Sequence, residues 1–188
     1  EALGELLCIR RTTFIVGPPG SGKSSRWRTL ARARNNVGLY RTTVQTLLPE
    51  ALGADLFGGY TESADGRPEW SQGFFATLLK KAPAKPKRRR KLSSMTSQQA
   101  VEDPRVNSSW IVLDGAMSAE QASTFISLME HGVDFEQANG ETIAISPDQS
   151  ILCECDSLEW TTPSLLSKAG LIHIAASEQS ANAVHFLT

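Results

Sequence analysis

Short apolar runs alternate along this chain with stretches whose apolar residues recur at helical spacing. The first run, Thr12–Val16 (TTFIV), is apolar and β-branched, which is typical of a buried strand. Similar runs predict strands at Val37–Val44, Ser109–Gly115, Ser150–Cys155 and Leu171–Ala175. Helical spacing predicts helices at Ser24–Arg34, Ser71–Ala82, Ser118–Glu130 and Thr162–Lys168. The alternation predicts an α/β fold, with a parallel five-stranded sheet and helices on both faces.

Local signals support the predicted helices. The residues expected to face the core are Trp27, Leu30 and Ala31 in the first helix, Phe74, Phe75, Leu78 and Leu79 in the second, and Phe125, Leu128 and Met129 in the third. Ser71 is a candidate N-cap of the second helix. Ser118 and Gln121 have the spacing of a capping box, which predicts that the third helix begins there.

Two further stretches differ in their turn signals. Asn139-Gly140 lies between two strand-like arms within Phe135–Ile145, and this dipeptide predicts a β-hairpin. Residues 52–70 contain several glycines and a proline that interrupt any regular pattern. We therefore expect turns and loops over residues 52–70.

Composition changes abruptly over residues 83–107. This segment contains three prolines, a run of Lys and Arg, and then Ser, Thr and Gln, with almost no large apolar side chain. We expect a basic, solvated and disordered insert, because such a segment buries too little apolar surface to fold. A nuclear-localisation signal, or a patch for an acidic surface, is the alternative interpretation of the basic run.

Overall composition sets wider limits on the chain. It has 188 residues, enough for one domain with a sizeable core, and its formal charge is −1. Nothing in that charge indicates nucleic acid as a specific partner, and no apolar run approaches the ~20 residues that span a membrane. The odd number of cysteines suits a reducing compartment. We expect Cys153 and Cys155, which share one face of a strand, to be structural.

The segment after the first strand has the pattern of a phosphate-binding loop. Residues 17–24 read GPPGSGKS, which matches G-x-x-x-x-G-K-[ST], and they lie between a predicted strand and a predicted helix. The glycines let backbone N–H groups point at phosphate oxygens, Lys23 reaches the terminal phosphates, and Ser24 ligates Mg²⁺. We therefore expect ATP or ADP with Mg²⁺ as the ligand. A glycine-rich turn that only resembles the motif is the alternative.

A second part of the site is predicted at the ends of later strands. Ligands bind beyond the carboxyl ends of the strands in such sheets, and Asp114 ends the run WIVLD, as a Mg²⁺-supporting acid does. An ordinary solvent-facing Asp is the alternative. The residues predicted to bind nucleotide are Gly17, Pro18, Pro19, Gly20, Ser21, Gly22, Lys23, Ser24, Ser25, Asp114 and Glu154, and those predicted to hold the metal are Ser24 and Asp114.

The residue after Asp114 argues against efficient hydrolysis. In many ATPases of this class a Glu follows the metal-supporting Asp and polarises the attacking water, whereas here the residue is Gly115. Glu120 and Glu154 remain as candidate bases, one within a predicted helix and the other on a different strand. We expect binding without efficient hydrolysis, and we assign no catalytic residue.

Several of these segments, taken in order, resemble the second AAA+ module of a dynein heavy chain. The likeness rests on the phosphate loop, LFGGYTES and PEWSQGFFATLL, SSWIVLDGAMSAEQASTFISLMEHG, the hairpin NGETIAI, and SILCECDSLEWTTPSLLSKAGLIHI. A tryptophan-containing strand that ends in Asp-Gly is typical of this module, whereas the other dynein modules usually have Asp-Glu. The resemblance implies that residues 1–188 form the large α/β subdomain of an AAA+ module, with a phosphate-loop NTPase fold and a β-hairpin insert.

The resemblance also implies a setting for the chain. The family forms a ring of six modules in one long chain that moves on microtubules, and its second module binds ATP mainly as a structural ligand. Neighbouring modules, dynein intermediate and light chains, and microtubules are the implied partners, in the cytoplasm and cytoskeleton or in the axoneme of a cilium or flagellum. The chain has no initiator Met, and the helical lid of an AAA+ module does not follow Thr188. We therefore expect an excised piece of a longer protein.

Two departures from the family bear on function. In the segment PSLLSKAG, the family has an Arg that acts on the ATP of the preceding module, and here the residue is Lys168. Lys lacks the planar fork of Arg, so the substitution changes the geometry that is offered to phosphate. The basic insert is the second departure. A non-motor scaffold derived from dynein is therefore an alternative to a motor module, and an independent phosphate-loop enzyme such as a kinase is a third.

Overall fold

A computed structural model describes residues 2–81, 106–130 and 134–175, without the side chains of 127–130. The expected basic insert over 83–107 therefore lies almost entirely outside the described residues, as do the side chains of Leu128 and Met129. Val106 and Asn107 were expected to belong to this insert. They form the start of a central strand instead, and the prediction was wrong for these two residues.

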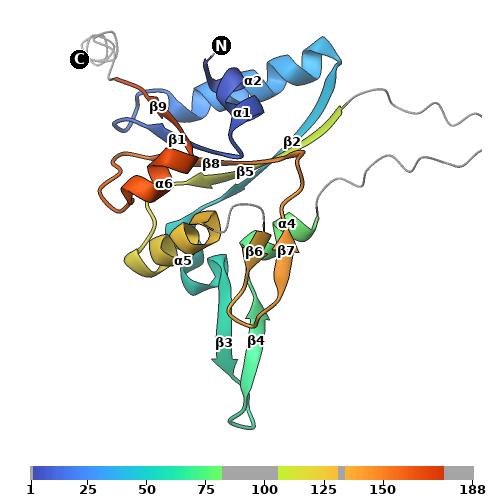
Figure 1. Cartoon of the computed structure of the whole chain (residues 1–188), viewed down its shortest axis with the longest axis vertical. Coiled ribbons are helices and arrows are strands. Elements are labelled where there is room, and N and C mark those ends of the chain that lie inside the picture. The colour runs from blue at the N-terminus through green and yellow to red at the C-terminus, as the bar shows by residue number, and fades with distance from the viewer. Residues whose placement is uncertain (1, 82–105, 131–133, 176–188) are drawn as a thin grey trace, which may run out of the picture.

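Five parallel strands form the central sheet, as the sequence predicts (Figure 1). They are β1 (Thr12–Val16), β2 (Tyr40–Leu47), β5 (Val106–Asp114), β8 (Gln149–Cys155) and β9 (Gly170–His173). Their order across the sheet is β2-β5-β8-β1-β9. Strand β8 thus lies between β1, which leads into the phosphate loop, and β5, which ends at Asp114. This order decides which residues meet at the candidate site.

Helices cover both faces of the sheet, which confirms the expected layers (Figure 1). One face packs against α1 (Ala2–Ile9) and α2 (Lys23–Val37), and the other packs against α4 (Phe74–Lys80), α5 (Ala119–Glu130) and α6 (Pro163–Lys168). A short helix α3 (Pro49–Leu52) and a 3-10 turn η1 (Gly53–Leu56) follow β2. The helix α1 was not predicted, because none of its residues is buried and its apolar pattern is short.

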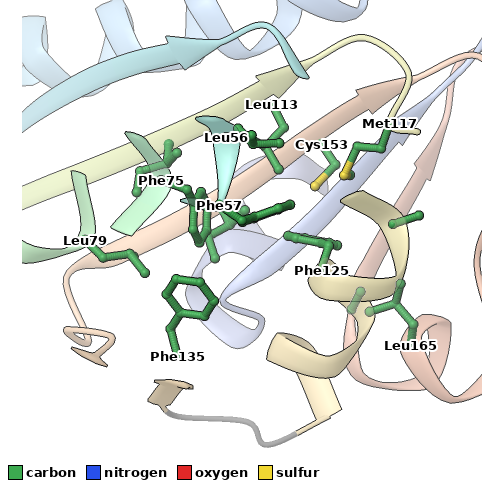
Figure 2. Packing of buried hydrophobic residues seen from close by; sticks show 14 of the residues in the cluster. Leu56, Phe57, Phe75, Leu79, Leu113, Met117, Phe125, Phe135, Cys153 and Leu165 are labelled. Atoms are coloured by element: carbon green, nitrogen blue, oxygen red, sulfur yellow. The ribbon is translucent and has the colours of Figure 1, made fainter. Parts of the chain in front are cut away.

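The two cores follow from the alternation of side chains along each strand. Phe14, Ile111 and Cys153 point to the face that carries α4, α5 and α6. On that face Phe57, Phe75 and Phe135 pack edge to face, and Phe125 lies beside them (Figure 2). Ile15, Val112 and Leu152 point to the opposite face, toward Trp27 and Ala31 of α2. By the same alternation Glu154 belongs to the α2 face, and Cys153 and Cys155 belong to the other.

Two β-hairpins extend the fold, and the sequence predicted one of them. The hairpin of β6 (Asp134–Glu136) and β7 (Thr142–Ala144) turns at Asn139-Gly140, with Gly140 at φ +81°, as expected. A second hairpin, β3 (Gly58–Glu62) with β4 (Pro68–Gln72), occupies the stretch where we expected loops. Its turn signal is Asp65-Gly66, with Gly66 at φ +72°. The surrounding glycines and proline concealed this signal.

Several predicted boundaries are also corrected. Val37 ends α2 and does not begin a strand, because Gly38 adopts the left-handed conformation that closes the helix. Ser71 pairs within β4, so α4 starts later, with Gly73 at its N-cap. Phe74, expected in the core, is 51% exposed. At Ser71, tertiary strand pairing overrides the local helical pattern.

The predicted capping box is present at the start of α5. The hydroxyl oxygen of Ser118 accepts a hydrogen bond from the backbone N–H of Gln121 at 3.2 Å, and the Gln121 side chain accepts one from the Ser118 N–H at 2.9 Å. The Gln121 amide also donates to the carbonyls of Pro49 and Gly53. Gln121 thereby ties α5 to the segment that follows β2.

Candidate nucleotide-binding site

The predicted phosphate loop lies at the carboxyl end of β1 and leads into α2. Gly20 and Gly22 have φ values of +77° and +86°, which L-amino acids with side chains rarely adopt. A Cβ at Gly17 would clash with the backbone carbonyl oxygen of Ile174. Three glycines of the motif are therefore required by the backbone, which curls over the N-terminus of the helix.

A cavity of about 560 Å³ opens beside this loop. It is lined by the predicted residues Pro19, Gly20, Ser21, Gly22, Lys23, Ser24, Ser25, Asp114 and Glu154, together with Arg28, Gly115, Ala116, Cys155, Asp156, Ser157 and Trp160. The loop after β1 and the ends of β5 and β8 thus meet at one cavity, as expected for the carboxyl edge of a parallel sheet. Gly17 and Pro18 do not line it, but their carbonyl oxygens bind Lys23.

Lys23 is held by three oxygen atoms near the loop. Its ammonium donates to the carbonyl of Gly17 at 2.6 Å, to that of Pro18 at 3.2 Å, and to the Oδ1 of Asp156 at 2.7 Å. The Asp156 side chain is 61% exposed, so this ion pair is close to solvent. The positive charge of Lys23 is therefore at the cavity wall, and Asp156 competes with any phosphate for it. No sequence signal indicated a role for Asp156.

Ser24 and Trp27 contact the same carboxylate. The Ser24 hydroxyl donates to Oε2 of Glu154 at 2.7 Å, and the indole N–H of Trp27 donates to Oε1. The two donors are three residues apart on α2 and therefore share the helix face that packs on β8. Glu154 is only 2% exposed. Trp27 was predicted as a core residue, and it is one, but no sequence signal indicated its hydrogen bond.

Asp114 and Gly115 form the opposite wall of the cavity. Asp114 is half-buried and lies next to Glu154 in the register of β5 with β8. The N–H of Gly115 donates to the backbone carbonyl of Glu154 at 3.1 Å, and Gly115 has φ +115°. That conformation strains any L-amino acid with a side chain. The backbone at residue 115 therefore disfavours a glutamate, the residue type expected of an active ATPase.

The two candidate bases are placed differently from each other. Glu120 lies exposed in the first turn of α5 and does not line the cavity. Glu154 lines it, but each of its oxygens already accepts a hydrogen bond.

Lys168, the residue predicted to act on the preceding module, ends α6 and is exposed, outside the cavity. Its backbone carbonyl accepts a hydrogen bond from Arg10 at 3.4 Å.

The buried cysteines are neutral thiols. Burial raises the pKa of Cys153 well above its usual value. Burial also raises the pKa of Cys155 to about 11, against the attraction of the nearby Lys23 charge. Both side chains pack in the core beneath the sheet, which supports the structural role expected for them.

The donor set fits a nucleotide-bound Mg²⁺ better than an all-protein metal site. The Ser24 hydroxyl and the Asp114 carboxylate are the oxygen ligands that Mg²⁺ takes when phosphates supply the rest of its shell. Within the described residues, no group of three or more His, Cys, Asp or Glu side chains could hold a metal ion.

The same part of the chain contains no helix long and apolar enough to cross a membrane.

Comparison with known proteins bears on the family of the chain. No protein-family profile matches it. It is 29% identical over 174 residues to the dynein beta chain of the flagellar outer arm from Chlamydomonas reinhardtii, which covers 93% of this chain and 3% of that protein. It is 28% identical over 182 residues to cytoplasmic dynein 2 heavy chain 1 from Homo sapiens, with 97% and 4% covered.

Human dynein axonemal heavy chain 9 is 28% identical over 172 residues, with 92% of this chain and 3% of that protein covered. The chain thus spans only a few per cent of the length of the curated relatives that it matches. The likeness extends over nearly all of the chain, and the chain has the α/β fold expected from it. This chain is therefore related to the dynein heavy chains and corresponds to one short segment of them.

Proposed function

We propose that this chain binds Mg-ATP or Mg-ADP as the large subdomain of an AAA+ module in a dynein-like heavy chain. The observation that carries the proposal is the meeting of Lys23, Ser24 and Asp114 at one cavity beside a glycine loop and a helix N-terminus. Loop N–H groups, the helix dipole and Lys23 would bind phosphates. Ser24 and Asp114 would hold Mg²⁺, which supplies charge neutralisation to the phosphates when bound.

The bound nucleotide would serve mainly as a structural ligand. Gly115 replaces the expected base, and the conformation of Gly115 disfavours any side chain. Of the two acids that remained as candidates, Glu120 lies outside the cavity and both Glu154 oxygens are engaged. We infer slow hydrolysis, since neither acid is placed to polarise an attacking water.

Calorimetric titration of the chain with Mg-ATP tests the binding proposal. The unmodified chain should bind, and Lys23→Ala should abolish the heat of binding, because the ammonium that reaches the terminal phosphates is lost. Lys81→Ala is the matched control, since Lys81 is an exposed lysine that does not line the cavity. Equal affinities for Lys23→Ala and the unmodified chain would contradict the assignment.

The wider setting is also a proposal. The relatives are named as flagellar outer-arm, ciliary, axonemal and cytoplasmic dyneins, so we place the full-length protein in the cytoskeleton, in the cytoplasm or the axoneme. Within it, the chain would be the second module of a motor ring, with neighbouring modules, dynein intermediate and light chains, and microtubules as partners. Position in the ring is supported by the Asp114-Gly115 pair and the order of the matched motifs.

Lys168 is proposed to face the nucleotide of the preceding module. It is exposed at the end of α6, away from the cavity of its own chain. A single ammonium offsets phosphate charge but lacks the bidentate geometry of Arg. In a full ring, Lys168→Arg should raise turnover at the preceding site and leave nucleotide affinity here unaltered. Turnover that is the same in Lys168→Arg, Lys168→Ala and the unmodified ring would rule out this contact.

A further inference from the structure

Glu154 is an acid in a buried position, where loss of hydration costs a carboxylate free energy. It lies on the central strand β8, is 2% exposed, and points to the sheet face that also carries the apolar residues Ile15, Val112 and Leu152. A buried carboxylate persists only where hydrogen bonds compensate for its lost hydration. Here both compensating donors come from the first turns of α2, the helix that follows the phosphate loop.

The two donors have different relations to the cavity. Ser24 lines it and is the hydroxyl proposed to ligate Mg²⁺, whereas Trp27 is 4% exposed and belongs to the core beneath α2. Glu154 therefore connects a rigid core residue to the proposed metal ligand. Asp114, the acid that the sequence pattern indicated, makes no hydrogen bond to the loop among the described residues.

We propose that Glu154 is a positioning residue for Mg²⁺, which acts by accepting the Ser24 proton in a hydrogen bond so that the hydroxyl oxygen is free to ligate the metal. A hydroxyl has one hydrogen to donate and two lone pairs. When the hydrogen is donated to Glu154, both lone pairs remain for a cation. Trp27 fixes the carboxylate by its second oxygen. The inference rests on the proposed nucleotide binding and adds the residue that prepares its metal ligand.

The isosteric variant Glu154→Gln breaks this arrangement in a defined way. Glutamine has one acceptor oxygen for two donors, so its NH₂ group must face either Ser24 or Trp27. If it faces Ser24, the hydroxyl accepts that hydrogen bond with a lone pair that the metal needs. The variant also removes a negative charge near the cation. Changes to such supporting residues typically cost about 10–100-fold in metal affinity.

The test measures ATP affinity by calorimetry in saturating Mg²⁺ and again in EDTA. The ratio of the two dissociation constants, EDTA over Mg²⁺, is the magnesium gain. Glu154→Gln should lower the magnesium gain by about tenfold or more, and leave the affinity in EDTA unchanged or slightly higher. The matched control is Glu159→Gln, which removes the same charge from an exposed acid outside the cavity and should leave the gain unchanged.

Trp27→Phe is the second variant, and it keeps an aromatic ring in the core while it removes the indole N–H. It should lower the magnesium gain by less than Glu154→Gln does. In the Glu154→Gln background it should have no further effect on the gain, because the two residues act through one hydrogen-bonded chain. If Glu154→Gln does not fold, as judged by circular dichroism, a gain that is unchanged in Trp27→Phe overturns the proposal.

Two results for a folded Glu154→Gln variant would also overturn the proposal that Glu154 positions Ser24. An unchanged magnesium gain would mean that Ser24 needs no positioning. An equal loss of affinity in Mg²⁺ and in EDTA would mean that Glu154 only supports the shape of the loop. Failure of the unmodified chain to bind ATP in either buffer would instead overturn the proposed function, and this inference with it.

Discussion

Two neighbouring strands end at the candidate site, and they serve it in different ways. At the end of β8, Glu154 binds Ser24 and Trp27, and Asp156 binds Lys23. At the end of β5, Asp114 lines the cavity and makes no hydrogen bond to the phosphate loop within the described residues. The acid after an apolar strand indicated β5 as the metal-supporting strand. Instead, β8 makes the contacts with the phosphate-loop motif and α2. It lies beside β1 in the sheet, and sheet order decides which strand end is nearest to the loop.

The largest expected effect comes from removing both acids together. Asp114→Asn and Glu154→Gln should each lower the magnesium gain, and the double variant should abolish nearly all of it, a loss of about 100-fold or more. The physical reason is that Asp114 would support the metal directly or through water, whereas Glu154 would position the Ser24 ligand of the metal. Calorimetry in Mg²⁺ and in EDTA measures it. If Asp114→Asn has no effect alone or in the double variant, β8 alone supports the metal.

Substitution of Gly115 tests whether the backbone at the end of β5 tolerates a side chain, and the free energy of unfolding is the measurement. Gly115→Ala should lower the free energy of unfolding by about 1–3 kcal/mol, because alanine is strained at φ +115°. Gly59→Ala is the control, since Gly59 has ordinary φ and open space around its Cβ position. Urea unfolding of both variants gives the comparison. Similar losses in the two would show that the backbone at Gly115 accommodates a side chain. Because it has the same φ requirement, Gly115→Glu should carry the same strain as Gly115→Ala, with little gain in phosphate release.

The buried thiols on β8 predict a fall of stability in alkali. Their pKa values are raised by burial, to about 11 for Cys155, from 9.0. Above pH 9 the unfolded chain loses thiol protons that the folded chain keeps, so the free energy of unfolding falls as pH rises from about 9 to 11. The slope is roughly 1.4 kcal/mol per pH unit for each thiol. Cys153→Ala should make urea midpoints less dependent on pH in this window, and an unchanged slope would contradict the assignment.

The smallest expected effect concerns Asp156. Asp156→Asn should raise nucleotide affinity by about 1.4- to 5-fold, because it removes the ion pair that competes with phosphates for Lys23. The effect is small because pairs this close to solvent are worth about 0.2–1 kcal/mol. Glu159→Gln again serves as the control for charge alone. Equal gains in affinity for the two variants would mean that general repulsion, and not the contact with Lys23, is responsible.

The elements that could be predicted were those with strong local patterns. The strand before the phosphate loop, the capping box at Ser118 and the Asn139-Gly140 hairpin follow from neighbouring residues and are all present. The hairpin of β3 and β4 was missed, and α4 was started too early, because pairing of Ser71 with Gly59 overrides the helical pattern there. Helix α1 was missed because it is short, although Leu3 and Leu7, which pack against the core, have helical spacing.

The sequence by itself determined the motif of a phosphate loop, the α/β alternation and the candidate ligands Lys23, Ser24 and Asp114, since these depend on the order of residue types over short spans. Only the tertiary structure decided that Glu154 and Trp27 meet Ser24, and that Asp156 meets Lys23. These partners are more than 120 positions apart in the chain. Their contact depends on the insertion of β8 between β1 and β5, and sheet order arises from the packing of the whole core, which no local pattern records.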